Sequence, residues 1–195
     1  SKKKKNKAKM IYEVIITTVN ANGSVHMAPM GIWKNEGKII ISPYRPSATL
    51  ENIKRTNKCI VNSIDDVRIF AGCLTGNKDW DLLPTEKVEG YRLKDALSHL
   101  ELELVMQEDD ELRPRFYFKP IHEVIHKPYK GFNRAQQAVL ELAILVSRID
   151  MLPWEKIEHE IKYLSIAIEK TAGSKEKIAW GWLMKKIEDS GHKIK

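Results

Sequence analysis

Residues 17–33 read TTVNANGSVHMAPMGIW, and this stretch indicates how the fold begins. An extended run rich in β-branched residues starts at Ile11, meets the turn signal ANG at 21–23, and resumes as a second extended run. A further turn signal, NEG at 35–37, precedes the strand-like KIIIS. The three runs therefore predict two consecutive β-hairpins.

Outside the hairpins, the pattern continues as mixed helix and strand up to about residue 127. ATLENIKRT (48–56) predicts a helix, with Ser47 as its N-cap and Asn57 just past its end. YRLKDALSHL (91–100) predicts a short helix. The remaining runs predict strands, and they read KCIVNSI, VRIFAGCL, LELELVM and LRPRFYFKPIHEVIHK, the last with prolines typical of edges or bulges.

The character of the chain changes after Tyr129. NRAQQAVLELAILVSRI (133–149) is a strongly apolar helical stretch, a second helix is expected from Trp154, and KEKIAWGWLMKKIED predicts a third. The layout is an α+β plan. We expect a β-rich domain over 10–128 and a helical subdomain over 129–195.

The positive charge of the chain is concentrated at its start. Six of the 33 lysines and arginines lie in residues 1–9, which contain no acid, and the other 27 face 26 acidic residues. We expect a disordered, lysine-rich tail over 1–9 attached to a nearly neutral body. Nucleic-acid binding through this tail is an alternative that the neutral body disfavours.

The cysteines and the hydropathy of the sequence indicate the cellular compartment of the protein. Cys59 and Cys73 form neither a disulfide framework nor a C-x-x-C site, and both lie in apolar runs typical of buried thiols. No stretch approaches the ~20 apolar residues of a membrane span. A cytoplasmic location is the expectation.

Residues 122–126 read HEVIH and match the zinc-peptidase signature H-E-x-x-H. That signature requires a helix, on which residues four apart share one face. The β-branched Val124 and Ile125 and the nearby Pro128 favour a strand instead, which would hold the two histidines ~13 Å apart, too far for one zinc ion. We therefore expect no metal site here.

The stretch ISPYRPSATLEN (41–52) offers an anion site. The start of a helix presents free backbone N–H groups and a positive dipole end, and the hydroxyls and the charge of nearby side chains add to it. The same pattern is also that of an ordinary strand-to-helix turn. The side chains that would take part are Tyr44, Arg45, Ser47 and Thr49.

The second informative stretch is VHMAPMGIW (25–33). Pro29 inside an extended run removes one ladder donor and predicts a bulge or an edge. Small residues at Ala28 and Gly31 would leave the backbone accessible to a flat ligand. An ordinary hairpin strand with an edge proline is the alternative.

Taken together, these segments resemble the FMN-binding split barrels of the flavin reductase-like superfamily. The resemblance rests on the hairpin TTVNANGSVHMAPMGIW, the element S-x-T-x-x-N-I-x-R-T and a strand ending in V-N. GFNRAQQAVLELAILVSRI is similar to one branch, the "domain of unknown function 447" family. The resemblance runs from about Met10 to the end of the chain.

The resemblance implies a six-stranded Greek-key split β-barrel with a C-terminal three-helix part, which forms a homodimer with FMN at the interface. It implies that Tyr44, Arg45, Ser47, Ala48 and Thr49 hold the FMN phosphate and that Asn52 braces the loop. Asn133 and Arg134 match the family's F-N-R element and become candidate substrate-binding residues. The flavin edge would be lined by His26, Met27, Ala28, Pro29, Met30 and Gly31.

Two functional hypotheses follow. The first is a flavin-dependent oxidoreductase or flavin reductase-like protein of unknown substrate, with a nicotinamide as its electron donor. No catalytic triad, G-x-G-x-x-G fingerprint or P-loop stands in the sequence. The second is a non-catalytic module that binds, stores or senses flavin.

Overall fold

The computed structural model describes residues 9–195, so the predicted tail at 1–9 lies outside the described residues except for Lys9. The chain forms two compact units. One contains the described part of Ser1–Ser63 together with Leu82–His126, and the other contains Ile64–Asp81 and Lys127–Lys195. The residues from 64 to 81, which the sequence placed in the β-rich domain, thus group with the C-terminal helices.

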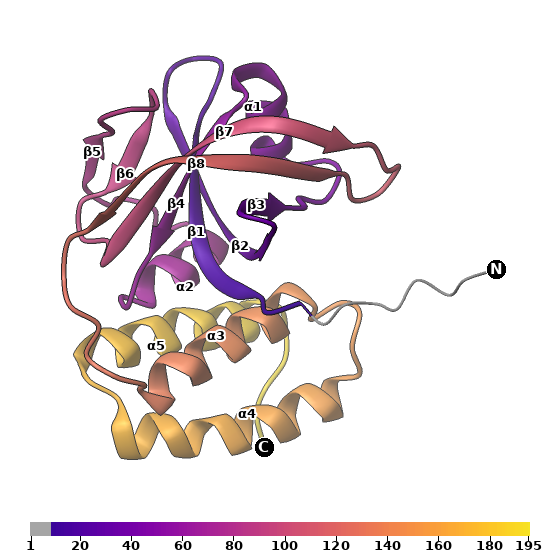
Figure 1. The fold of residues 1–195 in the computed structure, drawn as a ribbon. Coiled ribbons are helices and arrows are strands. Elements are labelled where there is room, and N and C mark those ends of the chain that lie inside the picture. The colour runs from indigo at the N-terminus through magenta and orange to yellow at the C-terminus, as the bar shows by residue number, and fades with distance from the viewer. Residues whose placement is uncertain (1–8) are drawn as a thin grey trace. The chain divides into compact units, whose positions relative to one another are not determined.

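The first unit is a closed six-stranded barrel, as the family resemblance implied, and its strands follow the order β1-β2-β3-β8-β7-β4 (Figure 1). Every neighbouring pair is antiparallel. The strands are β1 (Tyr12–Val19), β2 (Val25–Asn35), β3 (Lys38–Ile41), β4 (Lys58–Ser63), β7 (Ser98–Glu108) and β8 (Arg115–Ile125). Since β3 and β4 are consecutive in the chain but not neighbours in the barrel, the connection between them crosses one end of it.

That connection contains helix α1 (Ala48–Thr56), whose ends agree with the prediction. The Ser47 hydroxyl accepts the N–H of Leu50, and Asn57 ends the helix in the left-handed conformation with φ of 58°. Leu50 and Ile53 are buried in the barrel core with residues such as Phe116. Cap residues at both ends and one apolar face therefore fix this helix.

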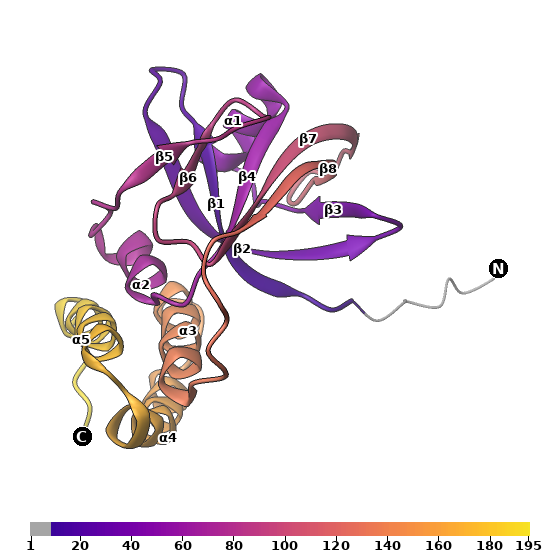
Figure 2. The same ribbon diagram turned by 60° about the vertical axis from the view of Figure 1, so that its left-hand side comes forward.

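A short two-stranded sheet, β5 (Leu82–Pro84) with β6 (Tyr91–Leu93), belongs to the same unit (Figure 2). The Thr17 hydroxyl donates to the Tyr91 carbonyl, and the Leu93 N–H donates to the Asn62 side chain. These bonds hold the β5–β6 segment against strands β1 and β4. The prediction of a short helix at 91–100 was wrong, because Leu93 pairs with Leu82 and residues from Ser98 onward pair with β8.

The second unit is helical and is described by itself. Its helices are α2 (Arg68–Thr75), α3 (Arg134–Ser147), α4 (Trp154–Thr171) and α5 (Ser174–Asp189). The three C-terminal helices were predicted, whereas VRIFAGCL was predicted as a strand and forms α2. Its β-favouring residues are overridden because a helix buries Val67 and Ala71 in one core with α3 and α5. No helix among residues 9–195 combines the length and the apolarity that a membrane crossing needs.

The two cysteines fit the expectation of packed thiols. Cys59 is 2% exposed in the barrel core, and burial raises the pKa of its thiol far above the ordinary value. Cys73 is partly buried, and burial, opposed by Lys78, raises the pKa of its thiol to about 11. Neither is a reactive thiolate at neutral pH.

Candidate functional site

The start of α1 is capped by Ser47 as the sequence predicted, and the predicted phosphate site at this helix start stays a prediction. Ser47 accepts the Leu50 N–H at 3.2 Å, while the N–H groups of Ala48 and Thr49 open the helix, where no acceptor within the helix is within reach. Ala48 is exposed, whereas the Thr49 side chain is buried. A phosphate at this position would therefore contact the backbone N–H groups first and the hydroxyls of Ser47 and Thr49 second.

Arg45 has partners within the barrel unit. Its guanidinium donates to the Asp109 carboxylate at 2.7 Å and to the Asp110 carbonyl at 3.0 Å, and its backbone N–H donates to Leu112. The backbone N–H groups of Arg113 and Leu112 lower the pKa of the Asp110 carboxyl. Arg45 thus fastens the loop before α1 to the turn between β7 and β8, and its charge is shared with that turn.

Tyr44 belongs to a second cluster around Arg113, a residue that the sequence did not single out. The Arg113 guanidinium lies 4.3 Å from the centre of the Tyr44 ring and donates to the Tyr44 hydroxyl at 3.2 Å and to the Ser42 carbonyl at 2.8 Å. Tyr44 is 54% exposed. Arg113 therefore brings a fixed positive charge and an aromatic face together beside the start of α1.

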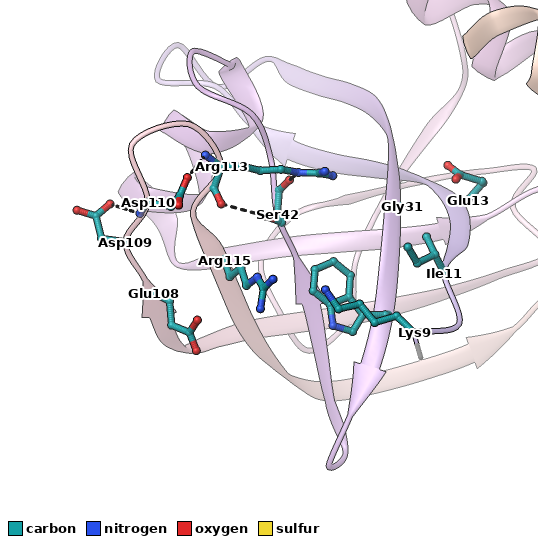
Figure 3. Close-up of a pocket in the computed structure, with 11 residues that line it drawn as sticks. Lys9, Ile11, Glu13, Gly31, Ser42, Glu108, Asp109, Asp110, Arg113 and Arg115 are labelled. Atoms are coloured by element: carbon teal, nitrogen blue, oxygen red, sulfur yellow. Dashed lines mark hydrogen bonds between the residues drawn. The ribbon is translucent and has the colours of Figure 1, made fainter. Parts of the chain in front are cut away.

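A cavity of about 560 Å³ lies beside this cluster (Figure 3). It contains Trp33, which has Lys9 Nζ 4.5 Å and the Arg115 guanidinium 5.8 Å from its ring centre. The volume is within the usual range for a small-molecule site. The lining consists of Lys9, Ile11, Glu13, Gly31, Trp33, Ser42, Glu108, Asp109, Asp110, Arg113 and Arg115.

Strand β2 carries the other predicted stretch, and Gly31 brings it to the cavity. Val25–Asn35 pairs with β1 in unbroken register, with Pro29 opposite Ile15, so the predicted bulge at Pro29 was wrong. The ladder between β2 and β3 starts only at Ile32. In the described part of the chain, residues 25–31 of β2 therefore have a strand on one side only, which confirms the predicted edge.

Gly31 allows a close approach at this edge. A Cβ built at Gly31 would lie 2.7 Å from Cγ2 of Ile11, which is itself a residue of the cavity wall. His26, Ala28, Pro29 and Met30 are partly exposed on the same strand, whereas Met27 is buried. The structure thus brings the end of the predicted flavin-edge stretch to the cavity through Gly31.

Asn52 has a bracing role, although toward a different loop from the one expected. Its amide donates to the Thr18 hydroxyl at 3.0 Å and to the Asn20 side chain at 2.9 Å, and its oxygen accepts from Arg55. Asn52 is 3% exposed. It therefore ties α1 to the β1–β2 turn and holds the two predicted stretches in one framework.

Asn133 and Arg134 lie in the helical unit. Asn133 is the N-cap of α3, since its side-chain oxygen accepts the Gln136 N–H at 3.0 Å, and its amide donates to the Thr171 carbonyl. Arg134 begins the helix and lines a groove of about 650 Å³ with residues of α3 and α4. The structure gives Asn133 a capping role, and the predicted role of both residues in substrate binding stays a prediction.

The HEVIH motif lies at the end of strand β8, as predicted. His122 pairs with Glu86 at 2.9 Å, and His126 pairs with His99 at 2.7 Å. Within residues 9–195, no three His, Cys, Asp or Glu side chains are arranged to hold a metal ion. The bulge expected near Pro120 is present, because the register with β7 shifts between Glu101 and Leu102.

Comparisons with known proteins agree with this architecture. A family model described as "Protein of unknown function (DUF447) N-terminal domain" matches residues 12–127, and one described as "Protein of unknown function (DUF447)" matches 133–185. An uncharacterised protein of Methanocaldococcus jannaschii is 27% identical over 150 residues, which cover 72% of this chain and 75% of the relative.

Three solved structures share the fold. An FMN-bound protein from Methanosarcina mazei is 19% identical with a TM-score of 0.77, over 92% of this chain and 96% of that one. The 2-nitrobenzoate 2-nitroreductase of Pseudomonas fluorescens is 18% identical with a TM-score of 0.52, over 62% and 67% of the two chains. A flavin reductase complexed with NADP+ is 14% identical with a TM-score of 0.53, over 63% and 83%.

At these identities the likeness shows the fold, which is the split barrel of FMN-binding proteins. The two family models follow one another along the chain, and the first spans more than half of it. The protein therefore belongs to the DUF447 family.

Proposed function

We propose that this protein binds FMN and acts as a flavin reductase-like oxidoreductase. The observation that carries the proposal is that one barrel unit contains three features: the open helix start at Ala48, the Arg113–Tyr44 cluster, and the cavity that Arg113 and Gly31 line. A family relative of the same fold is described as FMN-bound, which supports the same ligand.

The residues fit the chemical parts of FMN. A phosphate suits the N–H groups at the start of α1, with Ser47 and Tyr44 as hydroxyl partners. A flat ring suits the one-sided edge of β2, where residues 25–31 offer backbone groups and small side chains. Arg113 contacts Tyr44 in the loop before α1 and lines the same cavity as Gly31, so it adds positive charge to the cavity wall.

The bound flavin would supply hydride chemistry, and the chain would supply binding, orientation and electrostatics. Trp33 with Lys9 and Arg115 forms an aromatic wall flanked by cations, which suits an anionic or aromatic substrate or donor. A fold relative complexed with NADP+ supports a nicotinamide as the electron donor.

We further propose a homodimer that completes the site. Met10, Ile11 and Tyr12 are consecutive apolar residues, each more than half exposed, and Ile11 lines the cavity. A second copy that covers this patch would also close the cavity.

The free thiols of Cys59 and Cys73 support the proposed cytoplasmic location.

The direct test is the absorbance spectrum of the purified protein with the cofactor identified by mass, before and after addition of FMN. Flavin absorbance that stays with the protein through gel filtration supports the proposal, and no binding at micromolar FMN would refute it. Rapid anaerobic mixing with NADH or NADPH then tests catalysis. Reduction of the bound flavin supports the reductase, whereas bound but unreduced flavin supports a non-catalytic flavin module.

A further inference from the structure

The two histidines of HEVIH meet a third histidine and a glutamate on the outer face of strands β7 and β8. His99 and Glu101 alternate along β7 with the core residues Leu100 and Leu102, so they point away from the barrel interior. The His99 Nδ1 lies 2.7 Å from His126 Nε2, and the His99 Nε2 lies 2.8 Å from Glu101 Oε2. The three side chains form one continuous hydrogen-bonded chain.

Glu101 is the fixed, negatively charged end of this chain. It is fully buried and accepts three consecutive backbone N–H groups, from Glu86, Lys87 and Val88, at 2.6–3.2 Å. Burial acts to raise the pKa of Glu101, but the Val88 N–H, His99 and the N–H groups of Lys87 and Glu86 outweigh it and lower the pKa to about 2. Glu101 is therefore an anion at neutral pH.

This anion determines where the protons of the chain lie. A carboxylate only accepts, so the His99 Nε2 carries a proton and donates it to Glu101. The His99 Nδ1 then accepts from the His126 Nε2–H in the neutral pair. The ring planes differ by 2° and the nitrogens are 2.7 Å apart, so the rings meet end to end through a hydrogen bond rather than stacking face to face.

The same distances argue against a metal ion at these histidines. Two nitrogens bound to one tetrahedral zinc ion at ~2.0–2.1 Å each would be about 3.3 Å apart, wider than the 2.7 Å between His99 and His126. The Glu101 oxygens are already saturated by backbone donors and His99. The hydrogen-bonded chain of His126, His99 and Glu101 is therefore suited to hold protons rather than a metal ion.

We propose that the His99–His126 pair is a proton-controlled latch on the end of β8. One added proton leaves the bond intact, because one ring still accepts and Glu101 balances the charge. A second proton gives both facing nitrogens an N–H and leaves no acceptor between them, so the bond breaks. The latch therefore opens only when pH falls far enough for both rings to carry two protons each.

The latch holds a defined point of the chain. Strand β8 ends at Ile125, and the His126 backbone N–H donates to the Leu97 carbonyl at 2.7 Å, beside the paired rings. Loss of the side-chain bond removes the neighbouring restraint on this backbone bond. The end of β8 at residue 126 is therefore the part expected to loosen, while the barrel ladder upstream stays closed.

Other charged groups lie beside the pair or on the segments that adjoin it. His122 on β8 lies 6.4 Å from His99, ring centre to ring centre, and is itself paired with Glu86 at 2.9 Å. The remaining titratable groups are carried by the adjoining segments, namely Lys58, Lys87, Glu89, Asp95, Glu103 and Lys127. Lys58 and Glu89 form an ion pair at 3.8 Å.

The test is nuclear magnetic resonance of the full chain with ¹⁵N-labelled histidine, titrated between about pH 8 and 5, with amide exchange of His126 followed in the same samples. We expect His99 and His126 to titrate as a coupled pair in two steps, and amide protection of His126 to fall about tenfold at the second step. The exposed His159 on α4, which lies outside this hydrogen-bonded chain, serves as a reference in the same spectra.

Three variants separate the latch from general acid loosening. His126→Gln keeps an amide donor for His99 without titrating, so protection should no longer depend on pH. His126→Ala removes the bond, so the end of β8 should exchange at the fast rate at every pH, and His159→Gln should behave as the unchanged protein. Independent single-step titrations, or full protection with both rings protonated, would overturn the proposal. A stoichiometric Zn²⁺ shift of the His99 and His126 signals would overturn it in favour of a metal site.

Discussion

Two polar regions of the barrel unit differ in how completely their groups are paired. Around Glu101, each carboxylate oxygen has backbone or histidine donors, and both Glu101 and His99 are buried. Around Gly31 and Arg113, charged and aromatic side chains line a cavity, and Tyr44 is more than half exposed. The comparison shows that polar groups saturated by the chain itself stabilise the fold, whereas polar groups converging on open space are free to recognise a ligand.

The largest expected effect comes from breaking the saturated region. Glu101→Gln places an amide N–H₂ against backbone donors and leaves His99 without its acceptor, which should lower the free energy of unfolding by about 3 kcal/mol. Urea denaturation at pH 7 measures this change. Glu103→Gln, an exposed change on the same strand, is the matched control and should stay within about 0.5 kcal/mol.

The same variant gives a pH dependence with a definite sign. The pKa of Glu101 is lowered from 4.5 to about 2 in the folded protein, so the carboxylate contributes stability above about pH 4.5 and loses it as pH falls toward 2. The difference in unfolding free energy between the native protein and Glu101→Gln should therefore shrink over that window. A difference that is constant from pH 7 to pH 3 would contradict this reading.

The open region is tested by ligand affinity. Arg113→Met removes the guanidinium that contacts Tyr44 and Ser42, and it should weaken FMN binding by about 1–3 kcal/mol, measured by fluorescence titration. Lys38→Met removes an exposed positive charge from β3 and serves as the control. If the two variants bind FMN with equal affinity, Arg113 is not part of the anion site.

A smaller effect is expected at Gly31. Gly31→Ala brings a methyl group against the Ile11 side chain, which is flexible and half exposed, so the unfolding free energy should fall by only about 1 kcal/mol. The double variant Ile11→Ala with Gly31→Ala should recover most of that loss. Two independent, additive losses would show that the contact with Ile11 is not the reason for glycine here.

The smallest effect is expected at the rim of the saturated region. His122 pairs with Glu86, whose side chain is 66% exposed, and such partly solvated pairs contribute little. His122→Gln should therefore change the free energy of unfolding at pH 7 by about 0.5 kcal/mol or less. A loss comparable to that of Glu101→Gln would erase the distinction between the buried centre of the region and its rim.

Local signals predicted the parts of the fold that local chemistry determines. The turn residues predicted both hairpins, and Ser47 and Asn57 predicted the ends of α1. The β-branched Val124 and Ile125 correctly indicated that HEVIH lies on a strand. VRIFAGCL failed as a strand because its environment is set by α3 and α5, which are distant in sequence.

The candidate site shows the same division. Its helix start was predictable from the cap, whereas Trp33, Arg113 and Arg115 were missed because the cavity joins β2 to the β7–β8 turn across the barrel. The two arginines flanking Pro114 next to the acidic EDDE stretch were the available signal. The partners of the HEVIH histidines, His99 and Glu86, come from separate segments that no spacing rule connects.

Pro29 has a further consequence for solubility during and after folding. A strand edge with unpaired donors can recruit the edge of another chain and start β-aggregation. Among residues 9–195, the 25–31 stretch of β2 has a ladder partner only in β1, but Pro29 carries no N–H with which to extend a sheet. This one-sided edge of β2 is thereby protected against addition of a foreign strand.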